Sequence, residues 1–182
     1  EWTIEEQGII HLKNKIEQLG TPLRNWYLKI NSVLLTGYNE AFIINDATKN
    51  EVIKEDVETK AIIKPIIRGR DIKRYHYINS GQYLIVTHNG YLSANNEIIK
   101  AIDIDKYSAI KNHLKKYINQ LKERQDKGVT IYNLRDCAFM DDFAKEKIVW
   151  IELTNKNKFA YSNKEDYLLA GAFFMVGQSL KF

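Results

Sequence analysis

Cysteine and proline are almost absent from the sequence, which has one cysteine, Cys137, and two prolines among its 182 residues. A single cysteine can form neither an internal disulfide nor a cysteine-based zinc site. This excludes a disulfide-rich secreted fold, and a reducing cytoplasm suits the chain. Cys137 has no basic partner close to it in the sequence, so we expect a small buried apolar side chain rather than a nucleophile.

Long apolar runs are also missing, since none approaches the roughly 18 residues needed to cross a bilayer. No secretory leader stands before the first helical pattern. We therefore expect a cytoplasmic protein with no membrane partner. The chain opens on Glu1 rather than Met and stops at Phe182 just after an apolar stretch. We interpret residues 1–182 as one domain of a longer polypeptide.

The short motifs of several enzyme classes are absent as well. The sequence has no glycine-rich phosphate loop and no G-x-S-x-G nucleophile elbow. Neither Pro22 nor Pro65 has a proline neighbour, so the Asn-Pro-Pro-aromatic motif of amino-methyltransferases is missing too. We expect no catalytic residue, no cofactor and no metal in this part of the polypeptide.

One enzyme remains as an alternative, a small metal-dependent nuclease. Such a nuclease places two or three carboxylates and a lysine around a divalent ion. Asp46, Glu58 and Lys60 have this loose spacing, but no proline precedes Asp46. Spacings of this kind are frequent by chance. Mg²⁺-dependent DNA cleavage by the chain would favour this alternative.

Positive charge is present and clustered. The net charge is only +4, yet residues 60–75 carry six basic residues and one acid, Asp71. Apolar residues separate these charges, and Gly69 lets the backbone turn or approach another surface between two arginines. The segment is either a basic loop that meets a polyanion or a solvated turn in which Asp71 pairs with an arginine.

Hydrophobic periodicity predicts helices and strands in a mixed order. The expected helices are residues 5–19, 48–57 and 106–127. The expected strands or extended segments are residues 32–35, 41–44, 62–67, 83–87, 129–134, 147–152, 159–162 and 172–176. Helix, strands, helix and strands in this sequence predict an α+β fold, with a mixed or antiparallel sheet and flanking helices.

Two polar segments between the expected strands can be interpreted in two ways. Residues 36–40 form either a plain hairpin loop or a turn whose backbone N–H groups and Thr36 hydroxyl approach a phosphate. Residues 88–96 are rich in side chains that both donate and accept hydrogen bonds. Such side chains read base edges, but they also stabilise ordinary turns.

The expected helix at residues 106–127 supports a third kind of function. Its apolar residues fall on one face, and its lysines, Lys111, Lys115, Lys116 and Lys122, fall elsewhere. A solvated face explains these lysines, while a protein-interaction module is the alternative. His113 stands alone on this helix, so we expect a surface or capping role for it rather than metal binding.

A group of segments resembles the TaqI-like C-terminal specificity domains of type IIG restriction-modification enzymes and related adenine-specific DNA methyltransferases. The central segments are residues 36–44, 62–65, 68–72 and 74–75, in the order seen in that family. Supporting segments are residues 114–128 and 132–135, Phe143, residues 147–148, and the lead-in at Trp2 and residues 15–17. The resemblance spans nearly the whole chain.

This resemblance implies a DNA target-recognition domain. It would direct adenine methylation, and cleavage where the parent polypeptide also carries a nuclease, without catalysis of its own. Double-stranded DNA and the methyltransferase domain of the same polypeptide are the implied partners. S-adenosylmethionine, and Mg²⁺ in parents that cut, would bind outside this chain.

The resemblance also divides the candidate DNA contacts into two groups. Family members read different sequences but share the arginine-glycine-arginine stretch, so the shared residues suit phosphate positioning or the scaffold. These residues are Thr36, Tyr38, Asn39, Lys64, Arg68, Arg70, Lys73 and Arg74. Base readers are expected in the individual loops, at residues 76–82, 88–96 and 162–166. The candidates there are His88, Asn89, Tyr91, Ser93, Asn95, Asn96, Asn163 and Lys164.

Overall fold

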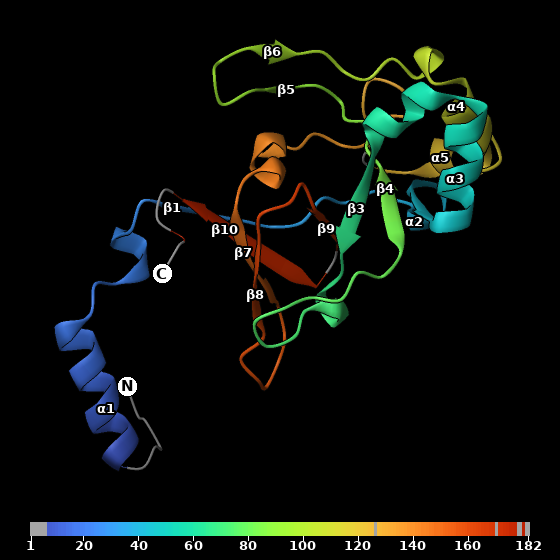
Figure 1. The fold of residues 1–182 in the computed structure, drawn as a ribbon. Coiled ribbons are helices and arrows are strands. Elements are labelled where there is room, and N and C mark those ends of the chain that lie inside the picture. Colours follow the sequence, from blue (N-terminus) through green and yellow to red (C-terminus); the bar gives the residue numbers. More distant parts are fainter. Residues whose placement is uncertain (1–6, 126, 170, 178–179, 181–182) are drawn as a thin grey trace.

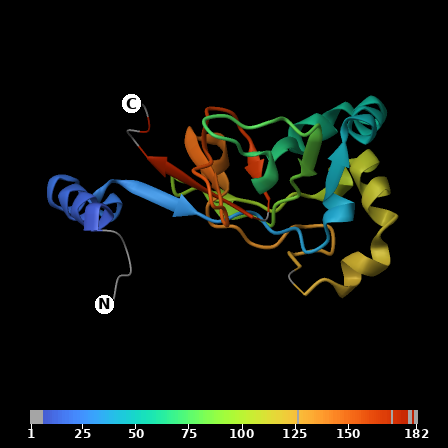
Figure 2. The ribbon, with the colours of Figure 1, turned by 90° about the horizontal axis from the view of Figure 1, so that it is seen from below.

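A computed structural model describes residues 7–125, 127–169, 171–177 and 180 (Figure 1). The chain has the expected α+β fold, with two four-stranded sheets, a two-stranded hairpin and helices at either end of the molecule (Figure 2). Among the described residues, no helix is long and apolar enough to cross a membrane. Of the residues used in the sequence analysis, Glu1, Trp2, residues 5–6, Asp126 and Phe182 lie outside the described residues.

The first sheet is antiparallel throughout, in the order β1-β10-β7-β8. Its strands are β1 (Leu28–Asn31), β7 (Lys147–Ile151), β8 (Phe159–Ser162) and β10 (Ala172–Gly177). Alternation puts Val149, Ala160 and Phe174 on the face that is buried in the core. The sequence predicted β7, β8 and β10 closely, because each is a run of β-branched or aromatic residues.

The second sheet is mixed, in the order β2-β4-β3-β9. Its strands are β2 (Ile43–Asn45), β3 (Ile63–Ile67), β4 (Gln82–Ile85) and β9 (Tyr167–Leu168). The β3 and β9 strands run parallel, with Ile66 opposite Tyr167, while the other pairs are antiparallel. Pro65 lies in β3, beside Tyr83 of β4. The separate hairpin is β5 (Tyr91–Leu92) with β6 (Ile98–Ile99).

Five α-helices and five short 3₁₀ turns complete the described part of the chain. The helices are α1 (Gln7–Leu19), α2 (Asn39–Phe42), α3 (Asp46–Glu55), α4 (Ser108–Lys115) and α5 (Ile118–Glu123). The turns are η1 (Leu23–Asn25), η2 (Val57–Ile62), η3 (Gly69–Asp71), η4 (Ile104–Lys106) and η5 (Met140–Ala144). Helices α2 to α5 gather beside the second sheet, whereas α1 projects from the opposite end (Figures 1 and 2).

The core lies between the two sheets, and Phe143 of η5 joins them. Its ring stacks on Tyr167 of β9 at 4.4 Å between centroids and lies 5.0 Å from Phe174 of β10. Cys137 is buried beside this cluster, as expected for a small apolar side chain. Burial raises the pKa of its thiol, which keeps it protonated and unreactive.

The prediction of one continuous helix at residues 106–127 is wrong, because this region contains two shorter helices, α4 and α5. Helix α4 ends at Lys115, where the N–H of Lys116 bonds to the His113 carbonyl in a tightened last turn. Helix α5 ends at Glu123, because Arg124 adopts an extended backbone with ψ of 134°. His113 is buried rather than on the surface, and its Nε2–H donates to the Ala41 carbonyl at 3.0 Å. Burial lowers its pKa, which favours the neutral ring.

Two expected strands are also wrong. Residues 32–35 are irregular, because the strand lies earlier, in β1, and Leu34 instead donates its N–H to the Leu168 carbonyl at 3.3 Å. Residues 129–134 form turns around Asn133, whose Oδ1 accepts from the Thr130 hydroxyl at 2.6 Å. The segment expected as a strand at residues 41–44 begins as α2 and becomes extended only at Ile43. In all three places a side chain or a tertiary contact overrides local propensity.

Gly69 is required by a close approach between backbones. A Cβ at this position would lie 2.4 Å from the Gly171 carbonyl oxygen, which is shorter than real Cβ contacts allow. The approach brings the end of β3 against the segment between β9 and β10. The use of Gly69 for close approach, one of the two roles expected from the sequence, is therefore confirmed.

Replacing Gly69 with alanine tests this contact. We expect Gly69→Ala to lower the free energy of unfolding by about 1–3 kcal/mol, because two backbones must separate to admit one methyl group. Urea denaturation followed by circular dichroism measures the change. Gly8→Ala is the matched control, since nothing lies within 4 Å of a Cβ there. Equal stability of both variants would show that the approach is not tight.

Candidate nucleic-acid interface

The basic stretch divides into arginines with different surroundings. Arg68 is half-buried and donates to the Asp71 carboxylate through Nε at 2.7 Å and Nη2 at 3.1 Å. Its Nη1 donates to the Gln82 amide oxygen at 2.6 Å. This bidentate pair ties the end of β3 to η3 and to the start of β4. The turn in which Asp71 pairs with an arginine, one of the two sequence interpretations, is therefore present.

Arg70 is exposed, and no described residue makes a hydrogen bond or ion pair with its side chain. It lines a shallow groove of about 480 Å³ together with Arg68, Gln82, Leu169 and the first residues of α2. The groove brings Asn39 next to the two arginines, although they are far apart in the sequence. Glu40 also lines it, so the groove is mixed in charge rather than purely cationic.

The turn at residues 36–39 is held by its own side chains. The Thr36 hydroxyl is buried and donates to Asn39 Oδ1 at 2.7 Å. The Arg124 guanidinium donates to the Thr36 carbonyl at 2.6 Å, and Gly37 has φ of +71°. The Tyr38 ring packs 6.0 Å from the Tyr117 ring. This geometry fits the scaffold role for Thr36 and Tyr38.

The remaining cations of the stretch also differ in exposure. Lys64 forms an ion pair with Glu165 at 2.7 Å. Lys73 donates to the Arg70 carbonyl at 2.9 Å. Arg74 is exposed and lies over the Tyr75 ring, with 5.0 Å between the guanidinium carbon and the ring centroid. The cations of the stretch that are presented to solvent are thus Lys60, Arg70 and Arg74, with Lys73 half-exposed.

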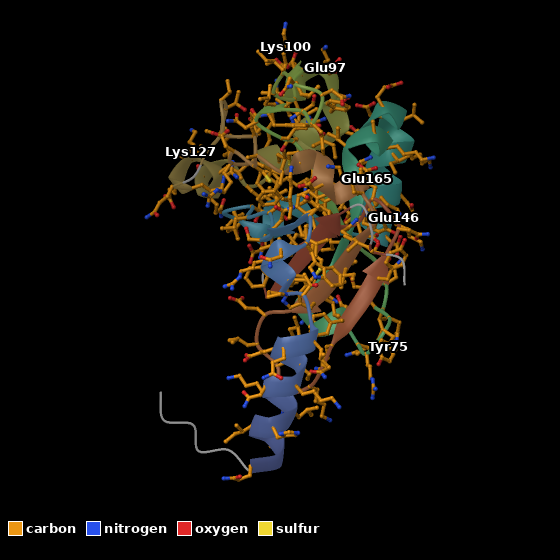
Figure 3. All side chains as sticks on the ribbon, turned by 90° about the vertical axis from the view of Figure 1, so that its left-hand side faces the viewer. Tyr75, Glu97, Lys100, Lys127, Glu146 and Glu165 are labelled. Atoms are coloured by element: carbon orange, nitrogen blue, oxygen red, sulfur yellow. The ribbon has the colours of Figure 1, made fainter. Side chains whose placement is uncertain are left out.

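Tyr75 is a feature that the sequence did not reveal. Its side chain is 77% exposed, and its φ is +69°, a left-handed conformation that costs a non-glycine residue of order 1–3 kcal/mol. The conformation is held by its N–H, which donates to the Phe159 carbonyl at 2.7 Å. Figure 3 shows Tyr75 at the outer edge of the molecule, far from Glu97. A positive φ at tyrosine has no sequence signal, so only the backbone shows it.

The polar loop at residues 88–96 is partly a hairpin. Tyr91 pairs with Ile99, and the connection turns at Asn96, which has φ of +63°. The Ser93 hydroxyl accepts the N–H of Glu97 at 3.1 Å. Asn95 is exposed, and no described residue bonds to its side chain. Asn96 is exposed as well, and no described residue bonds to its side chain, so both asparagines are free to meet a ligand.

The side chains of His88 and Asn89 lie at the base of this hairpin and hold it in place. The Asn89 amide donates to the Asp136 carboxylate and accepts the N–H of Val129. The His88 ring lies edge-on to Tyr91 at 5.2 Å, and burial lowers its pKa. Asn89 thus ties the hairpin to residues 129–136, as a turn-stabilising asparagine does.

A buried network of hydrogen bonds fixes the backbone of the loop at residues 162–166. Lys147 is fully buried, and its ammonium donates to the carbonyls of Phe143, Lys145 and Lys164 at 2.7, 3.0 and 2.7 Å. The Asp166 carboxylate accepts from Tyr77 at 2.6 Å and from Ser162 at 2.8 Å. The exposed side chains of Asn163 and Lys164 stand on this rigid base.

Two of the three loops expected to read bases are linked to each other, and the third is bonded to η5. Tyr77 joins the loop at residues 76–82 to the loop at residues 162–166 through Asp166. The N–H of Ala94 in the hairpin donates to Asp141 of η5 at 2.6 Å. Figure 3 shows Glu97, Glu165 and Tyr75, which precedes the loop at residues 76–82, at successive levels of the molecule, with α1 beyond them at the far end. A ligand that touches all three loops therefore has to extend along this part of the molecule.

The fold is similar to part of a restriction-modification enzyme. A solved structure of the type IIL restriction-modification enzyme MmeI in complex with DNA matches with a TM-score of 0.55 at 11% sequence identity. The match covers 80% of this chain and 19% of the MmeI chain. No family model and no curated protein matches the sequence. The similarity at this identity concerns the fold alone.

The nuclease arrangement considered from the sequence is not assembled in this fold. Asp46 opens α3 and pairs with Lys49 at 2.6 Å, while Glu58 lies beyond the other end of that helix. A helix of 10 residues is about 15 Å long. The two carboxylates therefore cannot share one ion. Among the described residues, no group of three histidine, cysteine or carboxylate side chains could hold a metal.

The lysine-rich surface considered for an interaction module is also divided. Lys111 pairs with Asp105 beside η4. Lys115 and Lys116 are exposed at the end of α4, and Lys122 lies on the separate helix α5. The kink between the two helices breaks the continuous face on which that alternative rests.

The buried Lys147 predicts how the free energy of unfolding changes with pH. Burial lowers its pKa to about 8, below the ordinary value of 10.5. The unfolded chain then binds a proton more readily than the folded chain between these two values, so stability rises with pH across that window. We expect the free energy of unfolding to rise by about 1–2 kcal/mol between pH 7 and 9.5. Tyr77 does not interfere there, because its pKa is raised to about 12 by burial.

Two lysine variants separate this effect from general titration. Lys147→Met should remove the rise, because the titrating group is gone, whatever its effect on stability at pH 7. Lys145→Met should keep the rise, since Lys145 is a surface partner of Asp142. Urea denaturation at four pH values measures both. A flat profile in the unmodified chain would show that Lys147 titrates normally.

Proposed function

We propose that this chain is the DNA target-recognition domain of a restriction-modification polypeptide, as the family resemblance implies. The observation that carries the proposal is the similarity of fold, over four fifths of the chain, to an enzyme that was solved with DNA. The domain would direct adenine methylation by a methyltransferase domain of the same polypeptide, and cleavage where a nuclease is also present. S-adenosylmethionine and Mg²⁺ would bind in those other domains, in the cytoplasm.

The exposed cations would provide the contacts that do not depend on sequence. Arg70 and Arg74 are presented to solvent on a stretch that the Arg68–Asp71 pair makes rigid. Phosphate contacts position a protein on DNA and look alike at every site. Arg68 and Lys64, whose charges are already paired, would hold the stretch in place.

The loops would provide the sequence readout. Asn95 on the hairpin and Asn163 and Lys164 on the loop after β8 combine exposure with a fixed backbone. Asparagine can pair bidentately with adenine in the major groove, and lysine with guanine. Tyr91 and Ser93 contribute to the shape of the hairpin, and Asn89 to its attachment.

The paired and unpaired arginines should behave differently on substitution. Arg70→Ala with Arg74→Ala should leave the fold intact and weaken DNA binding about equally for all duplex sequences. The slope of log affinity against log salt concentration should become shallower by about one unit for each lost phosphate contact. Fluorescence anisotropy with several duplexes measures both quantities.

Two further variants make this test specific. Lys115→Ala with Lys116→Ala removes the same charge from α4 and should change affinity and slope less. Arg68→Ala should instead lower the free energy of unfolding, by about 1–3 kcal/mol, because it leaves the buried Asp71 carboxylate unpaired. Loss of affinity for only one DNA sequence in the Arg70 and Arg74 variant would identify these arginines as base readers.

The asparagines test the readout. In the full-length polypeptide, Asn95→Ala should relax the preference at one position of the methylated motif, because one bidentate contact discriminates by roughly 1–3 kcal/mol. Asn89→Ala should lower stability and leave the motif unchanged. Sequencing of methylated adenines in cells gives the motif. An unchanged motif for Asn95→Ala and for Asn163→Ala would exclude both side chains from base reading.

The chain by itself should neither methylate nor cleave DNA. This expectation rests on the missing methyltransferase motif and on the separation of Asp46 from Glu58 by α3. Incubation with labelled S-adenosylmethionine, and separately with Mg²⁺ and plasmid DNA, tests it. Methyl transfer or Mg²⁺-dependent cutting by the purified chain would overturn the proposal that catalysis lies elsewhere.

A further inference from the structure

The first sheet has apolar side chains on both of its faces. An antiparallel sheet with one face on the core normally carries polar residues on the other. Here the outer-facing positions instead hold Leu28 and Ile30 from β1, Phe173 and Met175 from β10, Ile148 and Trp150 from β7, and Phe159 and Tyr161 from β8. Met175 is buried, and the other seven are partly or largely exposed. The two-residue alternation that builds the core thus builds a second apolar surface outside it.

Three aromatic rings run in a row across this outer face. Trp150 stacks on Phe173 at 5.9 Å on one side and on Phe159 at 6.0 Å on the other. Beside them, residues of the same face and of η1 line a groove of about 910 Å³. Apart from Asn157 its lining is aliphatic and aromatic, and it includes Leu23, Trp26, Tyr75 and Leu180. Contiguous apolar surface of this kind marks an interaction site.

Helix α1 has a matching apolar stripe that its own chain does not cover. Ile9, Leu12, Ile16 and Leu19 recur at helical spacing, and they are 52, 57, 61 and 78% exposed. No residue of α1 is buried, and the helix projects beyond β1 away from the body of the molecule (Figures 1 and 2). An amphipathic helix normally gains its stability by packing this stripe against another surface.

We propose that the outer face of the first sheet binds helix α1 of a second copy of this chain, and that two copies exchange their helices in a symmetric dimer. This inference is independent of the proposed DNA function.

The dimensions of the two surfaces agree. From Ile9 to Leu19 the stripe is about 15 Å long at 1.5 Å per residue. Four strands spaced about 4.8 Å apart span about 14 Å. One helix laid across the sheet therefore reaches every strand with its stripe.

Symmetry explains why the second copy is the partner. The chain carries both halves of the contact, so a two-fold axis makes the contact twice and leaves neither stripe nor face exposed. The face also lacks the cations that a nucleic-acid surface needs, because its members on all four strands are aliphatic or aromatic. An apolar helix stripe is thus the chemistry that suits it.

The mass of the chain in solution gives the first test. Sedimentation equilibrium at micromolar concentrations should give twice the mass of one chain. Leu12→Glu in the stripe and Phe159→Glu on the sheet should each weaken association at least tenfold. Asn14→Glu, on the polar side of α1, is the matched control and should leave the mass unchanged. Circular dichroism confirms that each variant is folded.

Cross-linking between two differently tagged chains gives the second test and does not depend on disruptive variants. One chain carries Leu12→Cys and the other Phe159→Cys, both with Cys137→Ala, and a short bismaleimide joins nearby thiols. A cross-link between the two tagged chains is expected. A cross-link only between two Leu12→Cys chains would mean that helices pair with helices, and would overturn the proposal.

Other outcomes contradict the proposal as well. A monomer that cross-links only within one chain carrying both cysteines would mean that α1 folds back on its own sheet. A monomer without any cross-link would leave the face to a different protein segment. A Phe159→Glu variant that loses affinity for single-stranded DNA without a change of mass would identify the aromatic row as a base-stacking surface.

Discussion

The hydrogen bonds made by the buried guanidinium of Arg124 are the interaction on which the part of the molecule around α2 and α5 depends. It donates to the carbonyls of Thr36, Ile131 and Asn133 at 2.6, 2.7 and 2.8 Å, and it lies over the Phe42 ring. Its Nε has no partner among the described residues. Burial lowers its pKa, but an arginine stays charged. One side chain thus fixes the turn before α2, the end of α5 and the turn before Leu134.

The buried ammonium of Lys147 fixes the loop that follows β8 in the same way, through bonds to backbone carbonyls. Both cations donate to backbone carbonyls rather than to carboxylates, so each fixes the course of the chain at several places at once. A buried charge without such partners would be costly, and the geometry is therefore tightly specified. The exposed side chains of Asn163 and Lys164 gain a rigid base from this arrangement, as a site that reads a ligand requires.

The division of the basic stretch was only partly readable from the sequence. The sequence left open a ligand-binding loop and an internally paired turn. The structure shows the paired turn through Arg68 and leaves Arg70 exposed, while ligand binding by the loop stays a prediction. Asn89 and Asn95 are chemically identical in the sequence. Their different surroundings, one bonded to Asp136 and one in solvent, arise from the path of the hairpin. Residue type alone cannot distinguish these two asparagines, because the difference depends on neighbours that are distant in the chain.

The sequence by itself determined the α+β class, the strands β3, β4, β7, β8 and β10, the buried Cys137 and the need for glycine at position 69. These follow from local chemistry, namely β-branched runs and a residue without a side chain. Only the tertiary structure decided where the long helix breaks, that Tyr75 adopts a positive φ, and that the described residues of α1 and most of the outer sheet face stay at least partly exposed. Each of these depends on hydrogen bonds or packing between segments far apart in the chain, which a pattern read along the sequence does not contain.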